Sequence, residues 1–297
     1  MHRRWLWIFV PFGIGLAAAL YIFLGGVSNP ILYAQADLGT LVFILGIGIS
    51  ALVGLGIAVL DRIEKIQVDT IIQSAESRRQ FLRRLDHELK NPLTAILAGL
   101  ANLSVLEQAE DHATTVRSVQ SQVSRLRRLV SELRKLSELE TRPLDRAQTD
   151  LTELLEDAFS LAQDQEGAGE RALTLSVPRA PWPLPTIHGD RDLLVLAIHN
   201  LLDNAIKFSR PGDRIEMRAF EDGSNVVVEV ADTGPGIPEK DQGLVWEELY
   251  RGEGARGIPG SGLGLALVRA IVARHEGTII LRSRPGEGTV FTMRLPV

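Results

Sequence analysis

The sequence predicts a multidomain protein that combines two transmembrane helices, an all-α helical hairpin and an α/β sandwich. Three observations predict this combination. Two apolar runs without charged side chains lie within residues 1–60. Apolar residues recur at helical spacing within residues 81–140, and helix and strand patterns are mixed within residues 150–297.

The first region, residues 1–60, predicts a membrane hairpin. Residues 5–27 and 38–60 carry no charge, and each run is long enough to cross roughly 30 Å of hydrocarbon as a helix. A cleaved signal peptide is the alternative for the first run. Signal peptides have shorter apolar regions of about 7–15 residues, and here a second run follows, so a transmembrane hairpin is favoured.

Flanking charges predict the orientation of this hairpin. Arg3 and Arg4 precede the first run, Arg62 and Lys65 follow the second, and the loop at 28–37 has neither Lys nor Arg. The positive-inside rule therefore places both chain ends in the cytoplasm and the loop outside. So short a loop cannot bury the core of a ligand-binding domain.

Small residues recur four apart in the second run, at Gly46, Ser50, Gly54 and Ala58. This spacing places them on one helix face, where they allow another helix to approach closely. A packing seam and the ordinary composition of a membrane helix explain the pattern equally well.

Residues 61–80 are charged but keep a helical pattern, so we expect a juxtamembrane helical linker. Within residues 81–140 two segments have an apolar stripe, the first at every fourth residue and the second at alternating spacings of three and four. They predict a helical hairpin. Because a two-helix hairpin buries little, two copies are expected to form a dimeric four-helix bundle.

His87 lies two residues from both Leu85 and Leu89, roughly 200° around the helix from the apolar stripe. An exposed imidazole beside Asp86 and Glu88 can act as a nucleophile if a carboxylate accepts the proton from its second nitrogen. From this evidence alone, a solvated surface histidine is the more common explanation.

A change in composition at 141–149, which contains Pro143, predicts a hinge linker. The remaining residues, 150–297, are expected to form one sheet with helices on one face. The predicted helices are 150–162, 190–208 and 263–275, and the predicted strands are 172–177, 214–220, 226–231, 278–282 and 289–295.

Three motifs in this last region can bind a nucleotide. Asn200, Asn204 and Lys207 share one helix face, where an amide oxygen can ligate Mg²⁺ and an ammonium can neutralise phosphate. Asp232 follows a strand, where its carboxylate can accept a hydrogen bond from an adenine amino group. The glycines of the second and third motifs allow the backbone close to a ligand, and the third opens a helix whose N–H groups suit phosphate. The second motif contains Gly234 and Gly236, and the third contains Gly262, Leu263 and Gly264.

Singly, each motif is weak, since a glycine-rich turn is more often only a turn. In this order they resemble the asparagine motif and the two glycine motifs of the GHKL (Bergerat-type) ATPases, in their histidine-kinase branch. Residues 86–92, DHELKNP, resemble the phosphoacceptor motif of the sensor histidine kinases. Residues 246–251 resemble the aromatic motif of that branch, with Trp246 and Leu249 where phenylalanine is more usual.

The resemblance implies a role for each matching residue. His87 is the phosphoacceptor, Glu88 an acid/base, and Asn91 positions water for a phosphatase reaction. Asn204 is the principal Mg²⁺ ligand, Asn200 and Lys207 lie beside the phosphates of ATP, and Asp232 binds adenine. The glycines with Leu263 shape the pocket, and residues 251–260 form a short lid.

The resemblance further implies a kinase that transfers phosphoryl groups to an aspartate of a response regulator. Together with the predicted spans and the predicted bundle, it leads us to expect a homodimer in the bacterial inner membrane. The short outer loop suggests that the signal is sensed within the membrane lipid or through an accessory membrane protein. Two alternatives stay open, namely a GHKL ATPase that drives conformational work and a scaffold that binds a partner without catalysis.

Composition excludes other classes of function. The net charge of −5 gives no basis for a nucleic-acid partner. The absence of cysteine excludes disulfides, thiolate catalysis and cysteine metal sites.

Overall fold

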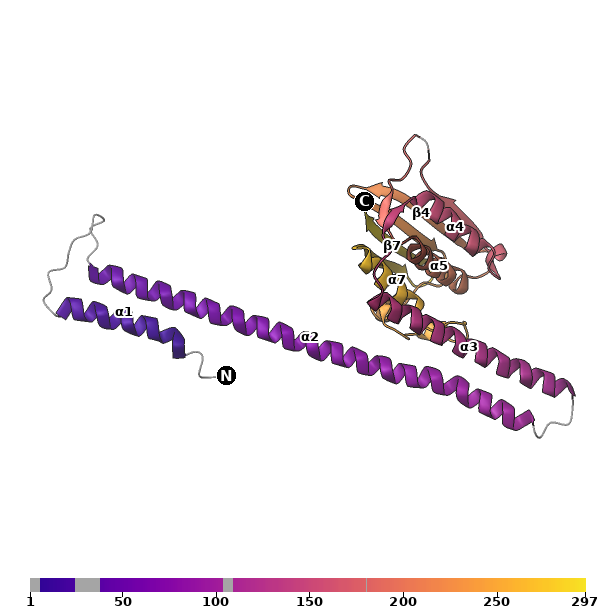
Figure 1. Ribbon diagram of the computed structural model, residues 1–297, viewed down its shortest axis with the longest axis horizontal. Helices are drawn as coiled ribbons and strands as arrows, with labels where there is room; N and C mark the ends of the chain where they lie inside the picture. The colour runs from indigo at the N-terminus through magenta and orange to yellow at the C-terminus, as the bar shows by residue number, and fades with distance from the viewer. Residues whose placement is uncertain (1–5, 25–37, 104–108, 180) are drawn as a thin grey trace. The chain divides into compact units, whose positions relative to one another are not determined.

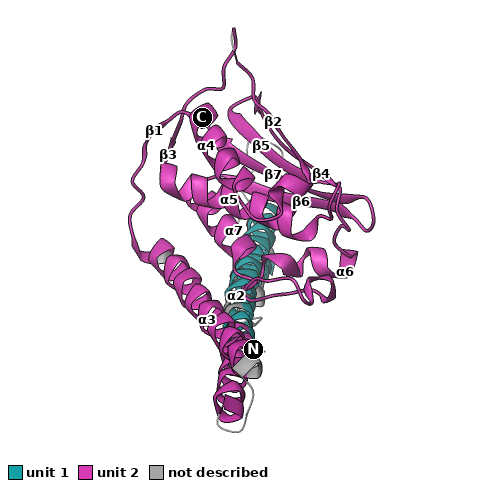
Figure 2. Cartoon of the chain, turned by 90° about the vertical axis from the view of Figure 1, so that its right-hand side faces the viewer, with its two compact units in different colours: residues 1–80 teal, residues 81–297 magenta. Residues whose placement is uncertain are grey.

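The computed structural model describes residues 6–24, 38–103, 109–179 and 181–297. The chain divides into two compact units, residues 1–80 and 81–297, which are described separately below (Figure 2). The loop predicted at 28–37 lies outside the described residues.

The first unit contains α1 (Leu6–Leu24) and the first part of α2 (Leu38–Leu103) (Figure 1). Among the described residues, one helical segment, Leu38–Asp69, is long and apolar enough to cross a membrane, with a mean hydropathy of 2.6. In the first run only Gly13–Ile22 qualifies as a shorter apolar helix. The second of the two predicted spans therefore has a matching helix, and the first stays a prediction.

Small residues bring α1 and α2 together. A Cβ added at Gly15 would lie 3.1 Å from the Cα of Gly46, so the two backbones are nearly in contact. Ser50, one turn further along α2, is also buried, whereas Ala58 is exposed. The interpretation as a packing seam thus holds for the first two members of the stripe, Gly46 and Ser50.

The second unit begins with a helical hairpin of α2 from residue 81 onward and α3 (Ala109–Thr141). Leu129 and Leu139 of α3 are buried. Other apolar side chains of the hairpin remain exposed at spacings of three, four and seven. These are Leu93, Leu97, Leu100, Val116, Val123 and Val130. A hairpin with so much exposed apolar surface needs a further partner to cover it.

The hairpin is followed by a sandwich whose main sheet has the strand order β2-β4-β5-β7-β6. Strands β2 and β4 are parallel, and the other neighbours are antiparallel. The strands are β2 (Ala172–Ser176), β4 (Arg214–Asp222), β5 (Asn225–Asp232), β6 (Thr278–Arg284) and β7 (Gly288–Pro296).

Helices cover one face of this sheet (Figure 2). They are α4 (Leu151–Gln163), α5 (Arg191–Phe208) and α7 (Gly264–Arg274). Burial alternates along β4, because only side chains on the helix-facing side, such as Ile215 and Met217, enter the core. The predicted sheet with helices on one face is confirmed. Short helices complete the sandwich at η1 (Ala168–Glu170), α6 (Glu239–Gln242), η2 (Leu244–Trp246) and η3 (Glu253–Ala255).

One small sheet was not expected from the sequence. Strand β1 (Ala147–Thr149) pairs antiparallel with β3 (Ile187–Gly189), and β1 lies inside the stretch predicted as a linker, 141–149. Thr149 is buried and its hydroxyl donates to the Gly189 carbonyl at 3.2 Å. Three-residue strands are too short for a sequence alternation to reveal them.

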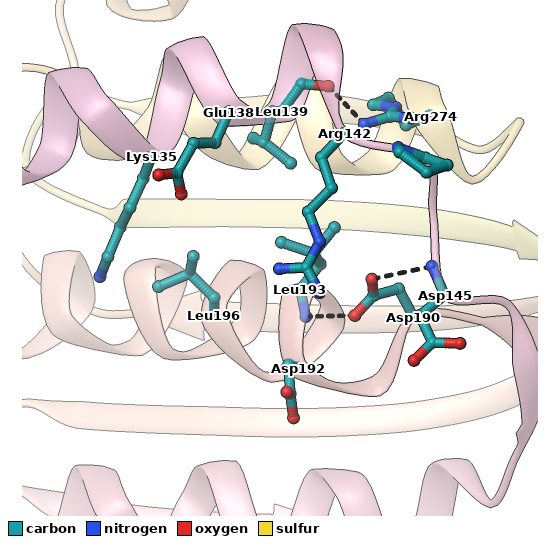
Figure 3. A pocket seen from close by; sticks show the side chains of 11 residues that line it. Lys135, Glu138, Leu139, Arg142, Asp145, Asp190, Asp192, Leu193, Leu196 and Arg274 are labelled. Carbon is teal, nitrogen blue, oxygen red and sulfur yellow. Dashed lines mark hydrogen bonds between the residues drawn. The ribbon is translucent and has the colours of Figure 1, made fainter.

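Hydrogen bonds fix the chain where it passes from α3 into the sandwich (Figure 3). The Asp190 carboxylate accepts from the backbone N–H of Asp145 and from that of Leu193, each at 3.2 Å. The Arg274 guanidinium donates to the carbonyl of Leu139 near the end of α3. These residues border a cavity of about 220 Å³. The end of α3 is therefore bonded to α7, and the segment between α3 and β1 is bonded to the residue that caps α5.

Candidate active site

A cavity of about 650 Å³ opens on the sandwich beside the first turn of α7. Residues from α5, the end of β5 and the segment before α7 line it. Most of the predicted binding residues are brought together here, namely Asn200, Asn204, Lys207, Asp232, Gly236, Gly262 and Gly264. Gly234 and Leu263 are not among the lining residues.

Helix α5 presents the polar motif because its opposite face is anchored in the core. The Asp190 side chain caps its start by accepting from Leu193 N–H. Leu194, Ile198 and Leu201 are fully buried, which fixes the rotation of the helix. Asn200 donates its amide N–H to the Leu196 carbonyl at 2.8 Å. The amide oxygen of Asn200 therefore remains available on the cavity side.

Lys207 is not free in this structure. Its ammonium lies 2.5 Å from the Asp203 carboxylate one turn earlier, and both residues line the cavity. Asp203 was missed by the sequence reasoning, although the spacing of four to Lys207 is typical of a helical ion pair. Phosphate would have to compete with Asp203 for this ammonium.

The cavity also offers oxygen ligands that suit Mg²⁺. Asn204, Asn200 and Asp203 all lie on its wall. Mg²⁺ prefers one or two protein oxygens together with water and substrate phosphates. No cluster of three or more His, Cys, Asp or Glu side chains that could hold a metal occurs in the described part of the chain. The donor set therefore fits an ion that is shared with a phosphate ligand.

Asp232 ends β5 at the cavity wall. Burial raises the pKa of its carboxyl, although backbone N–H bonds from Gly234 and Thr289 act in the opposite direction. The Gly234 N–H donates to Oδ1 at 2.9 Å. A Cβ at Gly234 would lie 2.9 Å from this same oxygen. The absence of a side chain at Gly234 therefore makes room for the Asp232 carboxylate rather than for the cavity. One carboxylate oxygen is thus held while the side chain faces the cavity.

Glycines are needed where the second and third motifs turn. Gly236 has φ +69°, and a Cβ there would lie 2.1 Å from the Arg284 carbonyl oxygen. Gly262 has φ +79° and would place a Cβ 2.7 Å from the Tyr250 carbonyl oxygen. Both positions combine a left-handed backbone with close contact, which only glycine tolerates.

Leu263 points away from the cavity. It is buried in a cluster with Leu129 of α3 and Leu249, and Phe81, Leu85 and Leu89 of α2 pack against this cluster. Its side chain packs the sandwich against the helical hairpin and is not among the lining residues, and its role in shaping the pocket stays a prediction. Its backbone still precedes the first turn of α7, whose N–H groups suit phosphate.

Polar contacts accompany this apolar cluster. Glu132 of α3 accepts a hydrogen bond from the Ser261 hydroxyl, and Arg128 and Glu132 both line the cavity. Arg84 of α2 lies 2.6 Å from the Glu247 carboxylate. Sequence reasoning missed these residues, because no local pattern signals a contact between segments so far apart in the chain.

The predicted phosphoacceptor lies on α2, outside the cavity. His87 and Asn91 are exposed, and neither side chain bonds to another residue within the described part of the chain. Glu88 is partly buried and accepts from Arg125 of α3 at 2.7 Å. The exposure of His87 agrees with the face predicted from the apolar stripe.

Residues 251–260, predicted as a lid, border the cavity. Arg251 donates to the carbonyl of Ala255 at 2.6 Å and also to that of Ile258. The segment is thus folded around one guanidinium and contains the short helix η3.

Two family models match the chain. The His Kinase A (phospho-acceptor) domain matches residues 77–142, and the histidine kinase-, DNA gyrase B- and HSP90-like ATPase matches residues 189–297. The first match contains His87, and the second contains every residue of the three nucleotide motifs.

Individual relatives agree with these matches. The sensor-like histidine kinase SenX3 of Mycobacterium tuberculosis is 37% identical over 227 residues, which is 74% of this chain and 54% of that protein. The probable sensor histidine kinase TcrY of the same species is 38% identical over 225 residues, or 74% and 46%. The chain spans about half the length of these curated relatives.

Solved structures share the fold. The Acinetobacter baumannii histidine kinase AdeS has a TM-score of 0.54 at 25% identity, covering 71% of this chain and 97% of that one. The histidine kinase ThkA, solved with the response regulator TrrA, has a TM-score of 0.61 at 23% identity, covering 73% and 61%. The latter likeness concerns the fold alone. With the motifs, the fold and the family models in agreement, the chain belongs to the sensor histidine kinases.

Proposed function

We propose that this chain is a membrane-bound sensor kinase that phosphorylates its own His87 with ATP and passes the phosphoryl group to an aspartate of a response regulator. The observation that carries the proposal is an exposed His87 in a phosphoacceptor motif, within the same compact unit as a nucleotide-sized cavity. The alternatives, a conformational ATPase or a non-catalytic scaffold, leave the motif around His87 unexplained.

In the proposed reaction, one ring nitrogen of His87 attacks the γ-phosphorus of ATP while the bond to the ADP oxygen breaks. The proton on the other ring nitrogen passes to the Glu88 carboxylate. Asp232 accepts from the adenine amino group, and Asn200 and Lys207 lie beside the phosphates. Mg²⁺, bound through Asn204, would supply charge neutralisation on the phosphates. The remaining catalysis is positioning.

We assign the chain regions accordingly. Residues 1–60 form two membrane spans, 61–80 a helical linker, 81–140 the dimerisation and phosphotransfer hairpin, 141–149 a hinge and 150–297 the ATP-binding domain. The exposed apolar stripe that includes Leu97 and Val123 supports a homodimer, because a second copy would cover it. ShkA, which was solved in complex with AMPPNP and is 27% identical to this chain, supports the nucleotide.

Membrane insertion is proposed with both chain ends in the cytoplasm of a bacterium and the loop at 28–37 outside. Lipid or an accessory membrane protein would then deliver the signal. Because the chain lacks cysteine, single cysteines at positions 2 and 33 report this topology cleanly. An impermeant thiol reagent should label position 33 in intact cells and leave position 2 unlabelled. Labelling at neither position would contradict the hairpin.

The decisive test is autophosphorylation of the purified chain with γ-labelled ATP. His87→Gln should abolish labelling, whereas His188→Gln, at an exposed histidine on β3, should label normally. Undiminished labelling of His87→Gln would remove this residue from the mechanism. ATP binding without any labelled histidine would favour the scaffold. Dephosphorylation of a prephosphorylated regulator, measured with Asn91→Ala, tests the phosphatase reaction.

A further inference from the structure

One of the side chains proposed for catalysis on α2 is held by a second helix. The Arg125 Nη2 of α3 donates to Glu88 Oε2 at 2.7 Å, across 37 residues of sequence. His87 and Asn91, by contrast, have no side-chain hydrogen bond within the described residues. The Glu88 carboxylate is thus the member of this group whose position the tertiary structure fixes.

The bond to Arg125 leaves one oxygen of the Glu88 carboxylate able to accept a proton. Arg125 engages one oxygen of Glu88, and no described residue donates to the other. The Glu88 side chain is 20% exposed, so its second oxygen is not sealed inside the hairpin. A glutamate has several rotatable bonds, and a general base works only when it is held within hydrogen-bond reach of the proton that it removes.

We propose that Arg125 is a positioning residue for autophosphorylation, which orients the Glu88 carboxylate for proton transfer from His87. The inference rests on the proposed function. As the phosphorus–nitrogen bond forms and ADP leaves, the ring proton passes to the free oxygen of Glu88. Arg125 itself exchanges no proton and touches neither ATP nor the imidazole.

Stability alone gives little reason for this pair. An ion pair whose arginine side chain is 42% exposed contributes little to folding, because solvent screens it and ordering two long side chains costs entropy. Removal of Arg125 should therefore leave the hairpin folded. Arg127, two residues on, is an exposed arginine without a described partner and provides a matched control.

The experiment measures kcat and KM for ATP in autophosphorylation of the full-length chain. Arg125→Ala should lower kcat about tenfold or more with KM unchanged, because only the transition state uses the oriented base. Arg125→Lys should recover part of the rate, since it keeps a cation. Arg127→Ala should match the unsubstituted protein, and circular dichroism should show an unchanged helix content in all three variants.

A double-mutant cycle separates positioning from a general structural role. If Arg125 acts through Glu88, then Arg125→Ala should cause no further loss in a Glu88→Gln background. An equal loss in both backgrounds, an effect confined to KM, or an unchanged kcat would overturn the inference. Normal labelling of His87→Gln would instead overturn the proposed function, so the two failures are distinguishable.

Discussion

Arg84 of α2 is bound to Glu247 of the sandwich, with its guanidinium 2.6 Å from the carboxylate. The same guanidinium donates to the Glu248 carbonyl at 3.1 Å and lies 5.3 Å from the centre of the Tyr250 ring. Arg84 is one helical turn before His87, so the contact holds the nucleotide domain beside the proposed phosphoacceptor.

The residues of α3 that line the cavity are offset along the hairpin from the residue that bonds Glu88. Glu88 bonds to α3 at Arg125, whereas α3 meets the cavity at Arg128 and Glu132. At 1.5 Å per residue, these positions lie about 5–10 Å further along the helix axis. We therefore expect the nucleotide domain to shift along the hairpin before phosphoryl transfer to His87.

Arg84→Ala should raise the autophosphorylation rate a few-fold, because it removes a restraint on this shift. Hydrogen exchange in residues 244–250 should increase in parallel. Arg78→Ala, at an exposed arginine earlier on the same helix, is the control and should change neither quantity. A slower reaction in Arg84→Ala would mean that the contact belongs to the reactive arrangement.

Glu132→Gln should tighten ATP binding by about three- to tenfold. The carboxylate borders the cavity and would repel a triphosphate, whereas an amide of the same shape can still accept from the Ser261 hydroxyl. Calorimetric titration with a non-hydrolysable ATP analogue measures the change. Glu138→Gln, on the same helix but outside this cavity, should have no effect. Weaker binding would assign Glu132 a favourable role.

Asp232→Asn should weaken ATP binding by at least about tenfold. The substitution replaces one carboxylate oxygen, which accepts from the adenine amino group, by an amide NH2 that cannot accept. The same variant should unfold at a higher temperature without nucleotide. Burial raises the pKa of the Asp232 carboxyl, so the folded state disfavours its charged form. Thermal unfolding with and without ATP checks both effects, and a lower unfolding temperature without nucleotide would contradict the second.

The pH dependence follows from the same raised pKa. The cost of ionising Asp232 in the folded state is fully present above the folded pKa and disappears as the pH falls below the unfolded pKa. ATP affinity should therefore increase with pH across the folded pKa of Asp232, because the carboxylate form is the acceptor. Affinity measured from pH 4 upward tests this, and Asp232→Asn should flatten the profile.

Gly236→Ala should destabilise the ATP-binding domain by about 2 kcal/mol or more. The position combines φ +69° with a carbonyl oxygen 2.1 Å from any added Cβ. Gly243→Ala is the matched control, since Gly243 has φ −74° and no atom within 4 Å of an added Cβ. Equal unfolding temperatures for the two variants would show that the turn at Gly236 can relax.

The sequence predicted most elements of the sandwich and the nucleotide motifs. Helix α5 illustrates why, because its capping residue Asp190, its apolar periodicity and the spacing of Asn200, Asn204 and Lys207 are all local features. The exposed face of His87 followed from helical periodicity in the same way. Strands β1 and β3 were missed because three residues carry no readable alternation.

By itself, then, the sequence determined which residues share a helix face and which turns require glycine, since these depend on neighbours within a few positions. Only the tertiary structure decided that Leu263 packs toward the hairpin and that Arg125 holds Glu88. It also decided that Arg84 binds Glu247, 163 residues away. Such contacts depend on how segments far apart in the sequence pack against each other. The apolar periodicity within one segment does not predict which residues of another segment it will contact.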